Sequence, residues 1–178
     1  MQLPNLNEVA IIHYGCSSFD SSDDTIYWIG VIHYHKGEKK YELWDGDEES
    51  ILIDYSNFLA ENDSKIFIHW SMNSPKYGFL IFKIKAKSFG ITNSVQPPHL
   101  IDLSEYLKDK YGVNYTPREG GRLNHLASYN RFTGKKAGIE VKTRSEAADR
   151  MELIFSIVQA EKQGSLIVDT EAIINPYP

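Results

Sequence analysis

Cysteine is nearly absent from this sequence, since Cys16 is the single cysteine among 178 residues. One thiol cannot build a disulfide framework, and it suits a protein kept in a reducing compartment. No stretch approaches the 18 uninterrupted apolar residues of a membrane-spanning helix. The first residues also lack the basic flank and the apolar run of a signal peptide. We therefore expect a cytoplasmic protein that does not enter the membrane.

Positive charge is also scarce, because the sequence has 19 Lys and Arg but 24 Asp and Glu, which gives a net charge of −5. This balance argues against a protein that binds nucleic acid over its whole surface, although it permits a local basic groove. The length fits one domain, which can bury roughly 70% of its unfolded surface without metal or disulfide support. We expect a single domain over residues 1–178, with a core at about 8–162 and a C-terminal tail at 163–178.

The first half of the chain changes from a strand pattern to a mixed one. Runs rich in β-branched and aromatic residues predict strands over residues 9–16, 25–35 and 40–44. Short turns join them, so these three strands should pair antiparallel. Apolar residues at helical spacing then predict a helix over 45–62, and a short apolar run predicts a fourth strand over 65–70.

The second half predicts mainly helices. Residues 75–89 fit both the alternation of a strand and the spacing of a helix. We favour a helix because Pro75 can begin one and Gly90 can end one. An extended segment over 99–102 precedes helices over 104–111 and 122–129. A capping box at Thr143 and Glu146 begins the last helix, which Gly164 ends. A final strand is expected over 165–169.

This order of elements resembles that of the ribonuclease-H-like proteins, specifically the branch of DnaQ-like 3′–5′ exonucleases. The residues that carry the resemblance are Asp24–Val31 with its Ile-Gly-Val, the run Ile66–Trp70, and Ile101–Leu103. The resemblance covers roughly residues 8 to 162. It implies an α/β fold with a mixed sheet, in which three antiparallel strands are followed by parallel strands and helices flank both faces.

Exonucleases of this kind hydrolyse a phosphodiester with two metal ions held by four carboxylates, so the resemblance implies magnesium or manganese if the protein is active. Two of the carboxylates should stand two residues apart on the first strand, where alternate residues share a face. A third should follow the fourth strand. These positions hold no acid here; the residues are His13 with Gly15 or Tyr14 with Cys16, and Asn73 or Ser74.

The fourth carboxylate has candidates on the last helix, where Asp149 and Glu152 lie three residues apart on one face. The acidic turns over 20–24 and 45–49 could supply relocated ligands, but acidic turns are usually solvated. At best one carboxylate of the four survives at its expected place. This loss is the most informative feature of the sequence.

Histidines offer a different metal site. His33 and His35 flank Tyr34 and should project from one face of the second strand. His13 and His69 would lie nearby if the strand order is 3-2-1-4, and a group of neutral imidazoles suits zinc. No cysteine or carboxylate has the spacing to complete such a site, so ordinary strand histidines remain the main interpretation. His69 is also a candidate catalytic residue, as are Asp149 and Glu152.

Two basic segments could bind nucleic acid. The lysines of the helix expected over 75–89 include three on one face, and the segment 118–136 interleaves arginines with aromatic residues that can stack on bases. The candidate residues are Lys76, Lys83, Lys87, Arg122 and Arg131. The alternative is that these residues only keep the surface soluble.

These observations predict a catalytically degenerate exonuclease-like domain that acts as a binding module for nucleic acid or a partner protein, with no cofactor expected. One alternative is an active metal-dependent 3′–5′ exonuclease with relocated ligands. Another is a protein-interaction subunit with no role in nucleic-acid binding. The expected partners are single-stranded nucleic acid, a protein, or a second copy of the chain paired through a strand after Gly164.

Overall fold

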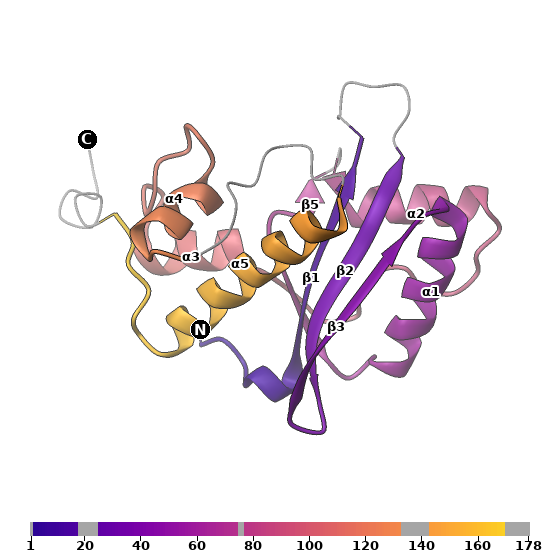
Figure 1. The fold of residues 1–178 in the computed structure, drawn as a ribbon, viewed down its shortest axis with the longest axis horizontal. Coiled ribbons are helices and arrows are strands. Elements are labelled where there is room, and N and C mark those ends of the chain that lie inside the picture. Colours follow the sequence, from indigo (N-terminus) through magenta and orange to yellow (C-terminus); the bar gives the residue numbers. More distant parts are fainter. Residues whose placement is uncertain (1, 18–24, 75–76, 133–142, 170–178) are drawn as a thin grey trace.

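A five-stranded mixed sheet forms the centre of the protein, seen in a computed structural model that describes residues 2–17, 25–74, 77–132 and 143–169 (Figure 1). The strand order is β3-β2-β1-β4-β7. β1 pairs antiparallel with β2 and β2 with β3, whereas β1 with β4 and β4 with β7 are parallel. The strands are β1 (Val9–Cys16), β2 (Ile26–His35), β3 (Glu38–Asp45), β4 (Ile66–His69) and β7 (Leu100–Asp102). The predicted α/β fold with three antiparallel strands followed by parallel strands is confirmed.

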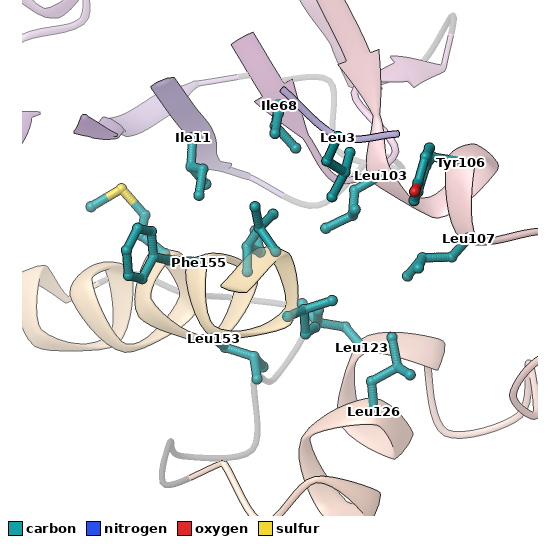
Figure 2. Close-up of a cluster of buried hydrophobic side chains, with 14 of the residues drawn as sticks. Leu3, Ile11, Ile68, Leu103, Tyr106, Leu107, Leu123, Leu126, Leu153 and Phe155 are labelled. Carbon is teal, nitrogen blue, oxygen red and sulfur yellow. The ribbon is translucent and has the colours of Figure 1, made fainter. Parts of the chain in front are cut away.

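Helices cover both faces of this sheet. α5 lies against one face, and α1 and α2 lie against the other (Figure 1). α3 and α4 extend the α5 side, where their apolar side chains meet those of α5 and of the N-terminal segment (Figure 2). The helices are α1 (Glu48–Glu61), α2 (Phe79–Ser88), α3 (Leu103–Tyr111), α4 (Arg122–Tyr129) and α5 (Arg144–Lys162), with a short 3-10 helix at Leu6–Glu8.

The central strand β1 shows why the sheet is enclosed. Val9 and Ile11 point into the cluster beneath α5, while Ala10 and Ile12 point into the cluster beneath α1 and α2. A strand that is buried on both faces reads as a continuous apolar run rather than an alternating one. That is the pattern that the sequence has at residues 9–12.

The helix termini confirm most of the expected local signals. Thr143 accepts the amide hydrogen of Glu146, and the Glu146 carboxylate accepts that of Thr143, so the predicted capping box begins α5. α2 is confirmed but begins later than expected, at Phe79. The residues before it form the short antiparallel strands β5 (Asn73–Ser74) and β6 (Tyr77–Gly78), while Pro75 itself lies outside the described residues.

Gly78 explains why α2 begins where it does. Its φ of 104° is a conformation that favours glycine, and a Cβ there would overlap the carbonyl group of Met72. Its amide donates to the hydroxyl oxygen of Tyr14 at 2.5 Å, which attaches this turn to β1. The turn therefore has to finish before the helix can begin.

The expected strand over 165–169 is wrong. The Asn130 side chain instead binds the backbone of Ile167 through both of its groups, at 2.7 and 2.8 Å, and the Asp169 amide donates to the Tyr115 carbonyl. These bonds use the backbone groups that a strand pair would need. The described part of the tail therefore offers no strand for pairing across a dimer.

No helix in the described ranges is long and apolar enough to cross a membrane.

One close approach fixes α5 on the sheet. Gly30 of β2 lies directly beneath Met151 of α5, and a Cβ at Gly30 would overlap the Met151 sulfur atom. We expect Gly30→Ala to lower the free energy of unfolding by about 1–3 kcal/mol, because it overfills a buried contact. In a Met151→Ala background the same substitution should cost much less, since the sulfur is gone.

Urea unfolding of the wild type, both single variants and the double variant measures this coupling. Equal destabilisation by Gly30→Ala in both backgrounds would contradict the contact.

Candidate functional site

The candidate site lies between the C-terminal half of β1 and the first turns of α5. Ligands of open α/β sheets bind outside the carboxyl ends of strands, where the direction of the sheet topology changes. β1 is that strand here, because β2 and β3 extend the sheet on one side of it and β4 and β7 extend it on the other. Of the two residue pairs considered for metal ligands, His13 with Gly15 shares the face of Ile11 toward α5, whereas Tyr14 packs on Phe82 of α2.

His13 is buried where the first metal carboxylate would be expected. Its ring makes an edge-to-face contact with Trp28 at 6.1 Å, and Trp28 packs against Ala147 of α5. Burial holds the pKa of His13 well below the ordinary value of 6.5, and the charges of Arg150 and His69 lower it further. The imidazole is therefore neutral at pH 7.

Arg150 brings a positive charge to the same place. It follows Ala147 by three residues and precedes Met151, so it lies on the side of α5 that faces the sheet, close enough to His13 to lower the pKa of the imidazole. Arg150 was not among the site residues predicted from the sequence. The available signal was its position inside the apolar stripe of Ala147, Met151 and Ile154.

The two acidic candidates on α5 do not converge with other ligands. Glu152 is drawn toward β3, where its carboxylate pairs with the Lys39 ammonium group at 2.7 Å. Asp149 is half-buried beside Arg150. Within the described ranges, no three His, Cys, Asp or Glu side chains come together as a metal site would require. Residues 20–24, whose acids were considered as relocated ligands, lie outside the described residues. The described donors do not form the two-metal centre that the resemblance to DnaQ-like exonucleases implies.

The alternative of a histidine metal site gains no support among the described residues, because strand register places His13 on the other face from His33 and His69. Ala10 of β1 pairs with His33 of β2, so His33 shares the face of Ala10, toward α1. Ile12 pairs with His69, which therefore also faces the α1 and α2 side and contacts Phe79 of α2. His13 has the opposite parity and faces α5.

His69 and Asp102 lie at the ends of the paired strands β4 and β7, with 3.7 Å between Nδ1 and the carboxylate. The amide of Met72 donates to Nδ1 at 3.2 Å, which puts the ring proton on Nε2. Asp102 instead accepts the amide hydrogens of Ser71 and Ser104 at 3.2 and 3.0 Å. Burial lowers the pKa of His69 although Asp102 opposes this. The geometry favours a structural role for His69 over a carboxylate-oriented general base.

The basic candidates do not form one surface. Lys83 and Lys87 are exposed one turn apart on α2 and have no acidic partner among the described residues, whereas Lys85 pairs with Glu48 at 3.2 Å. Arg122 packs over the ring of Tyr115 and donates to the Val113 carbonyl at 2.6 Å, so it stabilises the start of α4.

The remaining candidates lie elsewhere. Arg131 follows α4 and is exposed, on the far side of the sheet from α2 (Figure 1). Lys76 falls outside the described residues. The fold therefore leaves Lys83 and Lys87 as the adjacent pair of free cations among the predicted nucleic-acid ligands.

Comparisons with known proteins bear on the fold. No protein-family description matches the sequence, and no curated protein matches it. Among solved structures, the chain is similar to the family B DNA polymerase from the hyperthermophilic archaeon Pyrobaculum calidifontis, with a TM-score of 0.53 and 12% identity. The alignment covers 93% of this chain and only 24% of the polymerase. The Aedes aegypti Nibbler EXO domain aligns over 95% of this chain and 85% of its own length, with 15% identity and a TM-score of 0.49.

The strand order, the position of α5 and the similarity to the polymerase agree on one class. The chain has a ribonuclease-H-like α/β fold. At 12% identity this similarity speaks to the fold alone.

The buried imidazole of His13 predicts a pH dependence of stability. In the unfolded chain a histidine takes up a proton below about pH 6.5, whereas folded His13 resists protonation. Its contribution is therefore complete above the unfolded pKa and is lost as the pH falls below it. We expect unfolding free energy to fall between pH 7.5 and pH 5, by up to about 1.4 kcal/mol per pH unit for each such histidine.

Urea unfolding across this range should give a shallower pH dependence for His13→Gln than for the wild type. His33 and His69, whose pKa values burial also lowers, keep part of the slope. His99→Gln, at an exposed histidine, should leave the slope unchanged. An unaltered slope in His13→Gln would show that His13 is not held neutral.

Proposed function

We propose that this protein is a catalytically degenerate exonuclease-like domain that acts as a binding module. The observation that carries the proposal is the occupation of the β1–α5 site by His13 and Arg150. Two-metal hydrolysis needs several anionic oxygens at this place, to hold the ions and to balance their charge. A neutral imidazole supplies no anionic oxygen, and a cation adds positive charge instead of balancing that of the ions.

Electrostatics strengthens this interpretation. A guanidinium group cannot lose its proton in a protein, so the charge of Arg150 is permanent. A divalent cation about 5 Å from such a group is repelled by roughly 7 kcal/mol at an effective dielectric constant of about 20. Among the residues that the structure describes, one carboxylate at Asp149 cannot offset that repulsion for two ions. The alternative of an active nuclease with relocated ligands is therefore disfavoured.

A protein is the favoured ligand of this module. On the outer face of α2, Leu80 and Ile84 are 45% and 56% exposed beside Lys83 and Lys87. Exposed aliphatic residues suit a protein contact, whereas single-stranded nucleic acid is held by stacking on aromatic rings. Nucleic acid remains the second candidate, because Lys83 and Lys87 are free to contact phosphates and the similar polymerase is a DNA polymerase.

An activity assay tests the proposal. Purified protein is incubated with end-labelled single-stranded DNA and RNA, with magnesium or manganese and with a chelator as the control. We expect intact oligonucleotides in every reaction. Metal-dependent shortening that is lost in Asp149→Ala or Glu152→Ala would overturn the proposal and assign a relocated metal site to α5.

The same oligonucleotides distinguish the two ligand classes. Nucleic acid is favoured if the protein retains the oligonucleotides and this binding weakens steeply with salt, because phosphate contacts release counterions. The double variant Lys83→Glu with Lys87→Glu should then lose the binding. No retention favours a protein partner.

A further inference from the structure

A second concave site lies on the opposite face of the sheet from the β1–α5 site. It is a pocket of about 530 Å³ between α1 and the outer strands, here called the edge pocket. Residues of β2, β3 and α1 line it: His33, His35, Lys40, Glu42, Trp44, Asp54, Asn57, Phe58, Glu61 and Asn62. It shares no residue with the site described above.

The side chains that line this pocket are regularly spaced along α1 and β3. Asp54, Asn57, Phe58 and Glu61 follow one another at helical spacing, so they form one stripe along α1. Alternate residues of β3, from Lys40 to Trp44, turn the same face of the strand toward that stripe. The pocket is therefore a feature of the regular fold and not of a loop.

The charge of the edge pocket is negative. Asp54 and Glu61 form no ion pair with a described residue, and Glu42 contacts only the neutral His33, at 3.4 Å. Lys40 is the lysine of the lining, and its ammonium group already pairs with Glu38 at 2.6 Å. The pocket thus presents carboxylates from two elements to any ligand.

Aromatic walls add a second feature that suits a cation. The rings of Trp44 and Phe58 lie 5.3 Å apart and form the apolar side of the pocket. An ammonium or guanidinium group attached to an aliphatic stem can pack its stem on such rings while its charge meets carboxylates.

His33 points to a ligand independently of the carboxylates. Its side chain is only 6% exposed, it lines the pocket, and its Nδ1 has no hydrogen-bond partner among the described residues. When Nε2 donates to Glu42, Nδ1 is left as a buried acceptor without a partner among the described residues. Burial lowers the pKa of His33, so the imidazole does not oppose a cation at pH 7.

An open sheet edge borders the pocket. β3 is the outer strand of the sheet, and within the described part of the chain its other side has no strand partner. Its lysines are already engaged, because Lys39 pairs with Glu152 and packs over Phe155 while Lys40 pairs with Glu38. The unpaired backbone groups of such an edge can accept another strand.

We propose that the edge pocket binds a lysine or arginine side chain of an extended segment of a partner protein, which pairs with the open edge of β3. Main-chain hydrogen bonds to β3 would hold the segment, and the pocket would select its basic side chain. Alternate residues of an added strand face the same way as Lys40, Glu42 and Trp44, so a basic residue at every second position points toward α1. This inference goes beyond the proposed function, since it holds whether or not the β1–α5 site is catalytic.

The test uses the full chain, isotope-labelled for NMR, and the probe peptide acetyl-Thr-Lys-Thr-Lys-Thr-Lys-amide. We expect saturable shifts of the backbone amides of β3 and of the α1 stripe. The same peptide with glutamate in place of lysine should not bind. Butylammonium, a free amine without a backbone, should bind far more weakly than the lysine peptide.

Two double variants separate the pocket from general charge. Asp54→Asn with Glu61→Gln removes the free carboxylates and should weaken peptide binding by about tenfold. Glu49→Gln with Asp109→Asn removes the same charge outside the pocket and should leave the affinity close to that of the wild type.

Three results would overturn the proposal: no saturable shift with millimolar peptide, equal binding of the glutamate peptide, or equal affinity in the two double variants. Equal binding of butylammonium would also overturn it, by showing that strand pairing contributes nothing. Nuclease activity in the assay above would leave this inference intact, so the two proposals fail separately.

Discussion

The seating of α5 on the central strands determines what the candidate site contains. Met151 fills the space above Gly30, where β2 has no side chain, and this contact sets both the height and the rotation of the helix. With the helix so placed, Ala147 meets Trp28, and Arg150 comes near His13. A different rotation of α5 would bring Asp149 or Glu152 to β1 instead. The chemistry of the site therefore follows from a packing contact.

Much of the fold could be predicted because its signals are local. Apolar runs at the strands, a capping box at Thr143 and glycines after the helices each act within a few residues. The sheet order followed from the order of those elements. The segment 165–169 was misjudged because its backbone is bound by Asn130, a residue far away in the sequence. No local pattern could reveal that contact.

The site could be predicted only in part. The missing carboxylates at residues 13–16 were visible directly in the sequence. Whether the histidines meet depends on strand register, which the sequence does not fix, because a shift of one residue moves a side chain to the other face. Arg150 was overlooked because its role depends on the rotation of α5. The edge pocket was overlooked because it takes residues from β2, β3 and α1, which no single periodicity connects.

We propose that a neutral imidazole and a cation stand at the β1–α5 site in place of metal-binding acids. Calorimetric titration of the protein with Mn²⁺ tests this proposal, because Mn²⁺ is an ion that two-metal nucleases use and its binding needs no substrate. We expect no saturable binding at micromolar Mn²⁺. Stoichiometric binding that Asp149→Ala abolishes would contradict the claim and restore a metal centre to this face of the sheet.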